Sequence, residues 1–272
     1  MAWHPNVHHP LFRLDVSKGG AIEKGDNDEW AALASAAKNG HLDVTKNLIS
    51  RGAEVNQGDN DAEVNQGNND GFTALHFAAF NGHLNVTQYL IGQGAEVNQG
   101  NDGFTALHFA AFNGHLNVTQ YLVSQGADVN QGIIDGETAL HFAAFNGHLN
   151  VTQYLVSQGA DVNQGNIDGF TALHFAALNG HLNVTQNLVS QGADVNQGNN
   201  DGVTALHIAA LNGHLDVAKY LIGQGAEVNQ GNNDGVTALR IAAQEGHLDI
   251  TQYLISRGAE VNQGNNDVKE LR

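Results

Sequence analysis

The stretch "DGFTALHFAAFNGHLNVTQYL" occupies residues 70–90 and returns unchanged at residues 102–122. Its Gly-His pair occurs seven times along the chain, with steps of 42, 32, 33, 33, 33 and 33 residues. A fixed period of this length is typical of a protein built from stacked repeats. The longest step holds nine additional residues, 59–67, which repeat the "AEVNQG" before them. The sequence therefore predicts seven units, at about residues 28–58, 68–100, 101–132, 133–165, 166–198, 199–231 and 232–264.

Each unit contains the signals of two short helices. Thr73 is suited to cap a helix that begins near Ala74, and Gly82 is suited to end it, because glycine adopts positive φ at little cost. A second helix is predicted at about residues 84–92. The segment that follows is rich in Gly, Asn and Asp and ends in Asp-Gly, which is typical of a tight hairpin. One such unit cannot bury its own apolar face, so its stability must come from stacking on its neighbours.

These motifs resemble the ankyrin repeat, whose pattern is Gly-x-Thr-Pro-Leu-His-x-Ala-Ala, then Gly-His, then Gly-Ala-Asp-Val-Asn. The resemblance covers about residues 28–264. It departs from the family where Ala74 replaces the proline and where Arg240 replaces a histidine, and the first unit lacks both the Thr and the His. The resemblance implies an all-α solenoid of seven stacked helix-turn-helix units with protruding β-hairpin loops. It also implies a non-catalytic protein-interaction module.

The charge of the chain limits its partners. The net charge is −17, and the span between Arg51 and Lys219 holds fifteen Asp and Glu but no Lys or Arg. Such a surface repels nucleic acid and anionic lipid, so we expect neither as a partner. Any partner steered by charge should be basic. The chain has no cysteine and no apolar signal segment at its N-terminus, which favours a cytoplasmic location.

The repeated histidines and carboxylates do not form a pattern of catalysis or metal binding. His76 and His83 are separated by Gly82, which ends the helix, so they cannot share one metal-binding helix face. By the family resemblance both are structural hydrogen-bonding residues. The repeated acids fall in turns exposed to solvent, where nothing shifts their pKa values for acid–base work. We expect no enzyme activity, no cofactor and no metal site.

The first helix of each unit is apolar on two faces. Leu75 and Ala78 lie on the face toward the second helix, whereas Phe77 and Phe80 point the other way. We expect Phe77 to pack between units, and Phe80 to belong to a row that is apolar in the five central units. A second row follows the Asp-Gly of each hairpin. In the ankyrin family these rows hold partners, so the predicted peptide-binding residues are Trp30, Phe72, Phe80, Asn81, Phe104, Phe112, Asn113, Phe145, Asn146, Phe170, Leu178, Asn179, Val203, Leu211, Asn212 and Val236. The alternative is that the aromatic residues stack on one another and stabilise the array.

Residues 1–27 do not follow the period, and they hold both prolines. Their apolar residues alternate with polar and basic ones, which suggests a linear ligand joined to the repeats by a flexible segment, while a flexible tail is the alternative. The candidate ligand residues are Trp3, Val7, Leu11, Phe12 and Leu14. Docking within one molecule would give a monomer, and docking in a neighbour would give a dimer. Residues 265–272 are expected to cap the last unit.

The sequence thus favours a module that binds an extended peptide with apolar and basic residues. The alternative is a structural spacer with no specific ligand. Verbatim repeats suggest either an engineered or recombined fusion or a recently expanded natural array. The family resemblance also marks the Val-Asn asparagines as possible substrates of asparaginyl hydroxylation: Asn98, Asn130, Asn163, Asn196 and Asn229.

Overall fold

The computed structural model describes residues 28–58, 71–100 and 102–261. Within these ranges the chain forms helices joined by short turns, and no extended strand. The helices are α1 (Asp28–Lys38), α2 (Leu42–Ser50), α3 (Ala74–Phe80), α4 (Leu84–Gly92), α5 (Ala106–Phe112), α6 (Leu116–Ser124), α7 (Ala139–Phe145), α8 (Leu149–Ser157), α9 (Ala172–Leu178), α10 (Leu182–Ser190), α11 (Ala205–Leu211), α12 (Leu215–Gly223), α13 (Ala238–Gln244) and α14 (Leu248–Ser256).

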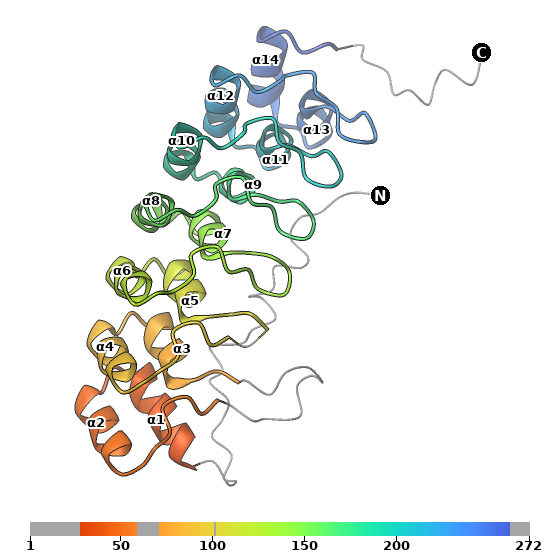
Figure 1. Cartoon of the computed structure of the whole chain (residues 1–272). Helices are drawn as coiled ribbons and strands as arrows, with labels where there is room; N and C mark the ends of the chain where they lie inside the picture. Colours follow the sequence, from red (N-terminus) through yellow and green to blue (C-terminus); the bar gives the residue numbers. More distant parts are fainter. Residues whose placement is uncertain (1–27, 59–70, 101, 262–272) are drawn as a thin grey trace.

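The helices pair into seven units that stack in chain order (Figure 1). The first helices of the units form one layer, and the second helices form a layer on the outer side of a gentle curve. Between units the chain projects to the inner side as a loop, which we call the finger of the unit that follows it. The all-α solenoid predicted from the sequence is confirmed. The described fingers are tight turns with isolated bridging, such as Gly231 with Thr237, rather than paired strands.

A glycine ends the first helix of each unit for two separate reasons. Gly82 has a φ of 74°, a conformation that other residues adopt only with strain. It allows the backbone N–H of His83 to donate to the carbonyl oxygen of Ala78 at 2.9 Å, which satisfies an open carbonyl at the helix end. A Cβ atom at Gly82 would also lie 2.6 Å from Nδ1 of His115 in the next unit. The glycine therefore serves both the turn and the stacking of units.

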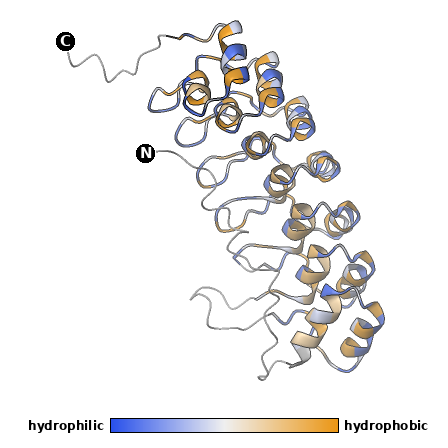
Figure 2. Ribbon diagram, turned by 180° about the vertical axis from the view of Figure 1, so that it is seen from behind, coloured by the Kyte–Doolittle hydropathy of each residue, from blue (hydrophilic) through white to orange (hydrophobic). Residues whose placement is uncertain are grey.

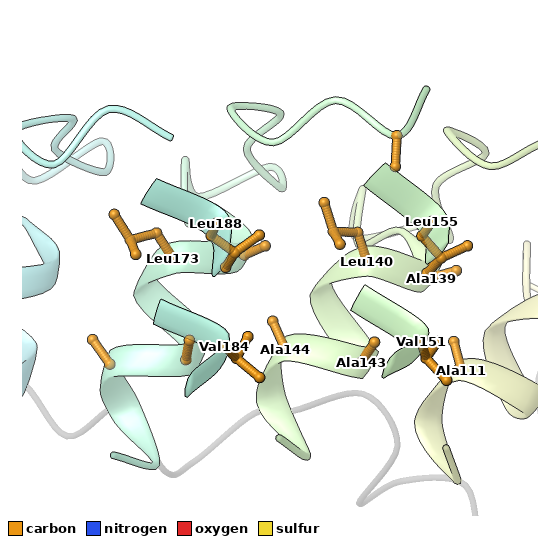
Figure 3. Packing of buried hydrophobic residues seen from close by; sticks show 14 of the residues in the cluster. Ala111, Ala139, Leu140, Ala143, Ala144, Val151, Leu155, Leu173, Val184 and Leu188 are labelled. Carbon is orange, nitrogen blue, oxygen red and sulfur yellow. The ribbon is translucent and has the colours of Figure 1, made fainter. Parts of the chain in front are cut away.

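One hydrophobic core runs along the whole stack between the two helix layers. In unit four, Ala139 of α7 lies beside Leu155 of α8, and Ala144 of α7 lies toward Val184 of the next unit (Figure 3). Alanine at two positions of each first helix lets the helices approach closely, as tight packing requires. Figure 2 shows apolar residues concentrated in the helices and hydrophilic ones in many of the turns.

The two ends of the described stack show why the units depend on one another. Val44 of the first unit is 49% exposed, whereas Val86, at the same position one unit later, is 1% exposed. In the last unit Leu248 is exposed, while its counterpart Leu215 packs against the core. Val44 and Leu248 are exposed because no described unit lies next to them, whereas a neighbouring unit covers Val86 and Leu215. Burial in this fold is therefore a property of the junctions between units, as expected for a repeat array.

Several predicted features lie outside the described residues. They are the candidate ligand segment with Trp3, Val7, Leu11, Phe12 and Leu14, the nine additional residues 59–67 and the C-terminal residues 265–272. Among the described helices, none is both long enough and apolar enough to cross a membrane.

Candidate protein-interaction face

The predicted row on the first helices lies at the last residue of each helix. Phe80, Phe112, Phe145, Leu178 and Leu211 end α3, α5, α7, α9 and α11, and each is partly buried. The three phenylalanine rings pack edge to face on the next unit, with centroid distances of 5.9, 6.4 and 6.2 Å. Each of these three rings thus has one side packed on the next unit and another open to solvent. We call the five residues Phe80, Phe112, Phe145, Leu178 and Leu211 the inner row.

The predicted row at the fingers is more deeply buried than the sequence indicated. Phe104 is 3% exposed, and its ring stacks on Phe109 at 5.8 Å and lies 5.9 Å from Phe142. Val203 is also buried in the core. The prediction that Phe104 and Val203 contact a peptide is therefore corrected, because their side chains would have to leave the core. Phe72, Phe170 and Val236 are partly buried.

Trp30 is also placed differently from its predicted role. It lies in α1, and its indole N–H donates to the carbonyl oxygen of Phe72 at 3.2 Å. Histidine makes the equivalent bond in later units, as His76 does with the carbonyl of Phe104. The first unit has Ala34 at the histidine position. Trp30 thus supplies the missing bond at the first junction, which the sequence did not reveal because α1 begins earlier than the other first helices.

The predicted asparagines stand directly after the inner row. The side-chain amide of Asn81 donates to the carbonyl of Phe77 four residues earlier, at 2.9 Å, and Asn113, Asn146 and Asn212 make the same bond in their units. Asn179 instead donates to the carbonyl of Phe145 in the preceding unit at 2.8 Å. These bonds satisfy helix-end carbonyls and fix the orientation of the amides beside the inner row.

The aromatic residues between units form a second core cluster near the fingers. Phe109 and Phe142 are fully buried in it, with Phe104 and Ile133, and Phe72, Phe80 and Phe112 pack against it. Edge-to-face contacts of this kind stabilise beyond the area that they bury. The expectation that the Phe77 position packs between units is confirmed by Phe109 and Phe142. The aromatic stacking that the alternative hypothesis proposed is present, and it holds the inner row in place.

In units two to six, the first histidine connects its own helix to the next finger. The backbone N–H of Thr73 donates to Nδ1 of His76 at 3.0 Å, so this nitrogen is an acceptor and the proton lies on Nε2. Nε2 then donates to the carbonyls of Gln99 and Phe104, both at 3.0 Å. Burial lowers the pKa of His76 from 6.5 to about 4. His108 and His174 have the same pKa for the same reason.

In units two to seven, the histidine of the Gly-His pair connects to the preceding unit. Nε2 of His115 lies 2.9 Å from the carbonyl oxygen of Phe80, at the end of the previous first helix. The same bond recurs at the junctions made by His83, His148, His181, His214 and His247. Both kinds of histidine therefore have structural partners. Among the described residues, no cluster of three or more potential ligands could hold a metal ion.

The Val-Asn asparagines also bridge units. The side-chain amide of Asn98 donates to the carbonyl of Gly126 at 3.0 Å and accepts from the backbone N–H of Asp128 at 3.0 Å. Asn130, Asn163, Asn196 and Asn229 make the same pair of bonds to the units that follow them. Every described junction of this type thus has a two-way side-chain bridge. Hydroxylation of these residues stays a prediction.

The finger of unit four carries an acid where the other units are apolar. Glu137 is 4% exposed, and Oε1 accepts from the side-chain amide of Asn166 at 3.3 Å. Burial raises its pKa from 4.5 to about 7, with smaller contributions from the charges of Asp135 and Asp168. The carboxyl group is therefore partly protonated at neutral pH, unlike an exposed glutamate.

The sequence analysis missed two residues at the finger tips. Ile134 is 73% exposed and Ile167 is 62% exposed, in the fingers of units four and five. Asn200 and Asn233 occupy this position in units six and seven. The signal in the sequence is that this position, which is asparagine in units six and seven, is isoleucine in units four and five. Considering only the positions that are apolar in most units does not reveal it.

The geometry agrees with the comparison to known families. Family models describing three ankyrin repeats match residues 58–133, 130–199 and 186–265, and a model of a single ankyrin repeat matches residues 28–60. Among the curated proteins compared with the chain, none matches it. Ankyrin repeats generally serve in protein–protein interaction and are typically not catalytic. Because these matches span nearly the whole chain, it belongs to the ankyrin repeat family.

Proposed function

We propose that the chain binds an extended segment of a partner protein along the inner row. The observation that supports this most directly is the inner row itself, in which five successive units each present one partly exposed apolar side chain at the same helix position. Packing on the next unit holds the three phenylalanine rings of the row in place. A surface fixed before binding loses little conformational entropy when a ligand docks.

The spacing of the row suits an extended peptide. Packed helices lie roughly 8–10 Å apart, and an extended chain rises roughly 3.3 Å per residue. About three ligand residues would therefore pass each unit. An apolar ligand side chain at every third residue would meet successive members of the row.

The charges beside the row favour a basic ligand. Asp102, Asp168 and Asp201 are exposed at the fingers of units three, five and six, and the span between Arg51 and Lys219, which contains all three, has no Lys or Arg that could neutralise them. Lys and Arg in the ligand would gain from this potential and speed the encounter. Residues 1–27 of the same chain combine apolar residues with Arg13 and Lys18 and are one such ligand, either in the same molecule or in a second copy. A cytoplasmic location is part of this proposal.

A spacer without a ligand is the second candidate function, and the aromatic packing favours it. The rings of the inner row contribute to junction stability, so their presence has a structural reason without any partner. The two functions differ in one measurable property, because a spacer has no saturable binding at the inner row.

The test compares two triple variants in a peptide-binding assay. Selection from a random peptide library on the immobilised full chain supplies the probe, and fluorescence polarisation gives its Kd. Replacing Phe80, Phe112 and Phe145 with Gln, the residue of the same position in unit seven, should weaken binding at least about tenfold.

The matched control replaces Tyr89, Tyr121 and Tyr154 with Asn, which Asn187 already provides at this position in unit five. It removes three aromatic side chains from the second helices and should leave the Kd unchanged. Equal affinity of all three proteins, or the absence of any selected peptide, would favour the spacer.

A further inference from the structure

Large apolar side chains that are strongly exposed fall into two groups in the described residues. Val44, Leu248, Ile255 and Val261 belong to the first and last units, where no described neighbour covers them. Ile134 and Ile167 are the remaining two, and they lie inside the array, on the fingers of units four and five. The missing neighbour that explains the first group does not explain this pair.

The two isoleucines are held on neighbouring fingers. The backbone N–H of Ile134 donates to the carbonyl of Asp102 at 3.0 Å, and that of Ile167 donates to the carbonyl of Asp135 at 2.9 Å. The finger tips therefore form one hydrogen-bonded series. Since Asp135 directly follows Ile134, the second bond ties the two isoleucine-bearing turns together, and their side chains are presented at successive positions.

The fold does not require isoleucine at these positions. In units six and seven, the backbone N–H groups of Asn200 and Asn233 make the same bond, to Asp168 and Asp201, both at 2.9 Å. An asparagine thus supports the same turn and avoids exposing an apolar side chain to water. Two exposed isoleucines lower solubility, and their side chains add no contact that stabilises the junction between these units.

The surroundings of the pair are acidic. Asp102, Asp135 and Asp168 lie in the same three tips, and Glu137 is buried below them. A second copy of the chain would bring another set of carboxylates against this one, so charge opposes self-association through the tips. A partner segment with an apolar side chain flanked by cations fits both features of this surface. The apolar side chain would be buried against the isoleucines, and the flanking cations would pair with the aspartates.

We propose that Ile134 and Ile167 form an anchoring site for an aliphatic residue flanked by Lys or Arg in the bound partner segment. The site rests on the proposed function, since it names the part of the ligand that lies over units four and five. It fixes the register of the ligand on the array, which the inner row cannot do because it repeats the same kind of side chain in each unit. Specificity then comes from a place where the exposed tips of the fingers differ between units.

The experiment uses the full chain and the double variant Ile134→Asn with Ile167→Asn. This variant gives both tips the residue found in units six and seven, so far-UV circular dichroism should be unchanged. Peptides selected from a random twelve-residue library on the wild type should share an aliphatic residue next to Lys or Arg. The labelled consensus peptide should bind the double variant about 30- to 100-fold more weakly, and each single variant about tenfold more weakly.

Two altered probes test the chemistry of the ligand. Changing the aliphatic residue of the consensus peptide to Ser, or its basic neighbours to Glu, should each weaken binding to the wild type at least about tenfold. The same changes should have little effect on binding to the double variant, because it lacks the two isoleucines that contact this part of the peptide. Equal losses on both proteins would overturn the proposal.

The outcomes separate this site from the inner row. If the triple Gln variant of the inner row loses affinity and the double tip variant retains it, the anchoring site is wrong and the proposed function stands. If only the tip variant loses affinity, the anchoring site is supported and binding along the inner row is wrong. If neither loses affinity, or if no peptide is selected, both proposals fail.

Discussion

Acidification should destabilise the array through its buried histidines. His76, His108 and His174 are neutral in the fold, with pKa values of about 4. In the unfolded chain they return to an ordinary value near 6.5. The stabilising contribution of the neutral ring is complete above pH 6.5 and is lost as the pH falls from 6.5 toward 4, because the unfolded chain then binds protons that the fold excludes.

The magnitude follows from these values. At about pH 5 each of the three histidines favours the unfolded state by about 2 kcal/mol relative to about pH 8, and together by about 6 kcal/mol. Glu137 acts in the opposite direction. Because its pKa is raised to about 7, protonation of Glu137 on acidification raises the free energy of unfolding by about 2–3 kcal/mol. These four groups together therefore give a loss of about 3–4 kcal/mol between about pH 8 and about pH 5. Burial also lowers the pKa values of His148 and His207, which adds to the loss in the same direction.

Urea denaturation followed by circular dichroism measures this loss directly. The free energy of unfolding should decrease between about pH 6.5 and about pH 5. His108→Gln should reduce the number of protons taken up on unfolding by about one. It should also lower the free energy of unfolding at about pH 8, because the hydrogen bond from His108 to the next finger is lost at any pH. A free energy of unfolding that is constant or rises on acidification would show that the histidines are not neutral bridges.

Three further outcomes follow from single positions. Glu137→Phe, which restores the aromatic residue of neighbouring fingers, should stabilise the chain by about 3 kcal/mol at about pH 8 and by about 1 kcal/mol at about pH 5, measured by urea denaturation; equal gains at both pH values would contradict the raised pKa. Gly114→Ala should destabilise the chain by at least about 1 kcal/mol, since Gly114 has a φ of 72° and no room for a Cβ. The control Gly92→Ala, in a helix with open space around it, should stabilise the chain by about 0.5–1 kcal/mol. Thermal unfolding of both variants checks the sign of each change. Trp30→Phe removes the bond to the Phe72 carbonyl and should cost about 1 kcal/mol, seen as faster amide exchange confined to α1 and α2; uniform exchange throughout the array would count against a local role.

The fold could be predicted from the sequence because its rules are local and recur seven times. Thr73, His76 and Gly82 each act within a few residues of their position, and the same choices return in every central unit. A periodic apolar pattern then needs only stacking to bury it. His76 was predicted to be a structural hydrogen-bonding residue, and the structure shows its partners, the carbonyls of Gln99 and Phe104.

The details of the interaction face could not be predicted in the same way. Whether Phe104 is open or buried depends on how far the next finger covers it, which is a distance between units that no local pattern contains. Trp30 was assigned by alignment to a finger, whereas the longer α1 places it in a helix. Ile134 and Ile167 were missed because their column is polar in other units, so their exposure becomes visible only beside Asn200 and Asn233.

The bonds that join units end mainly on backbone carbonyls, and this has a consequence for how the chain can change in length. A histidine that donates to a backbone carbonyl does not depend on which side chain the neighbouring unit carries. Removing one whole unit, or duplicating it, brings the same donors against the same acceptors. Copy number is therefore free to vary in steps of one period, while a change of any other size has to be absorbed within a finger.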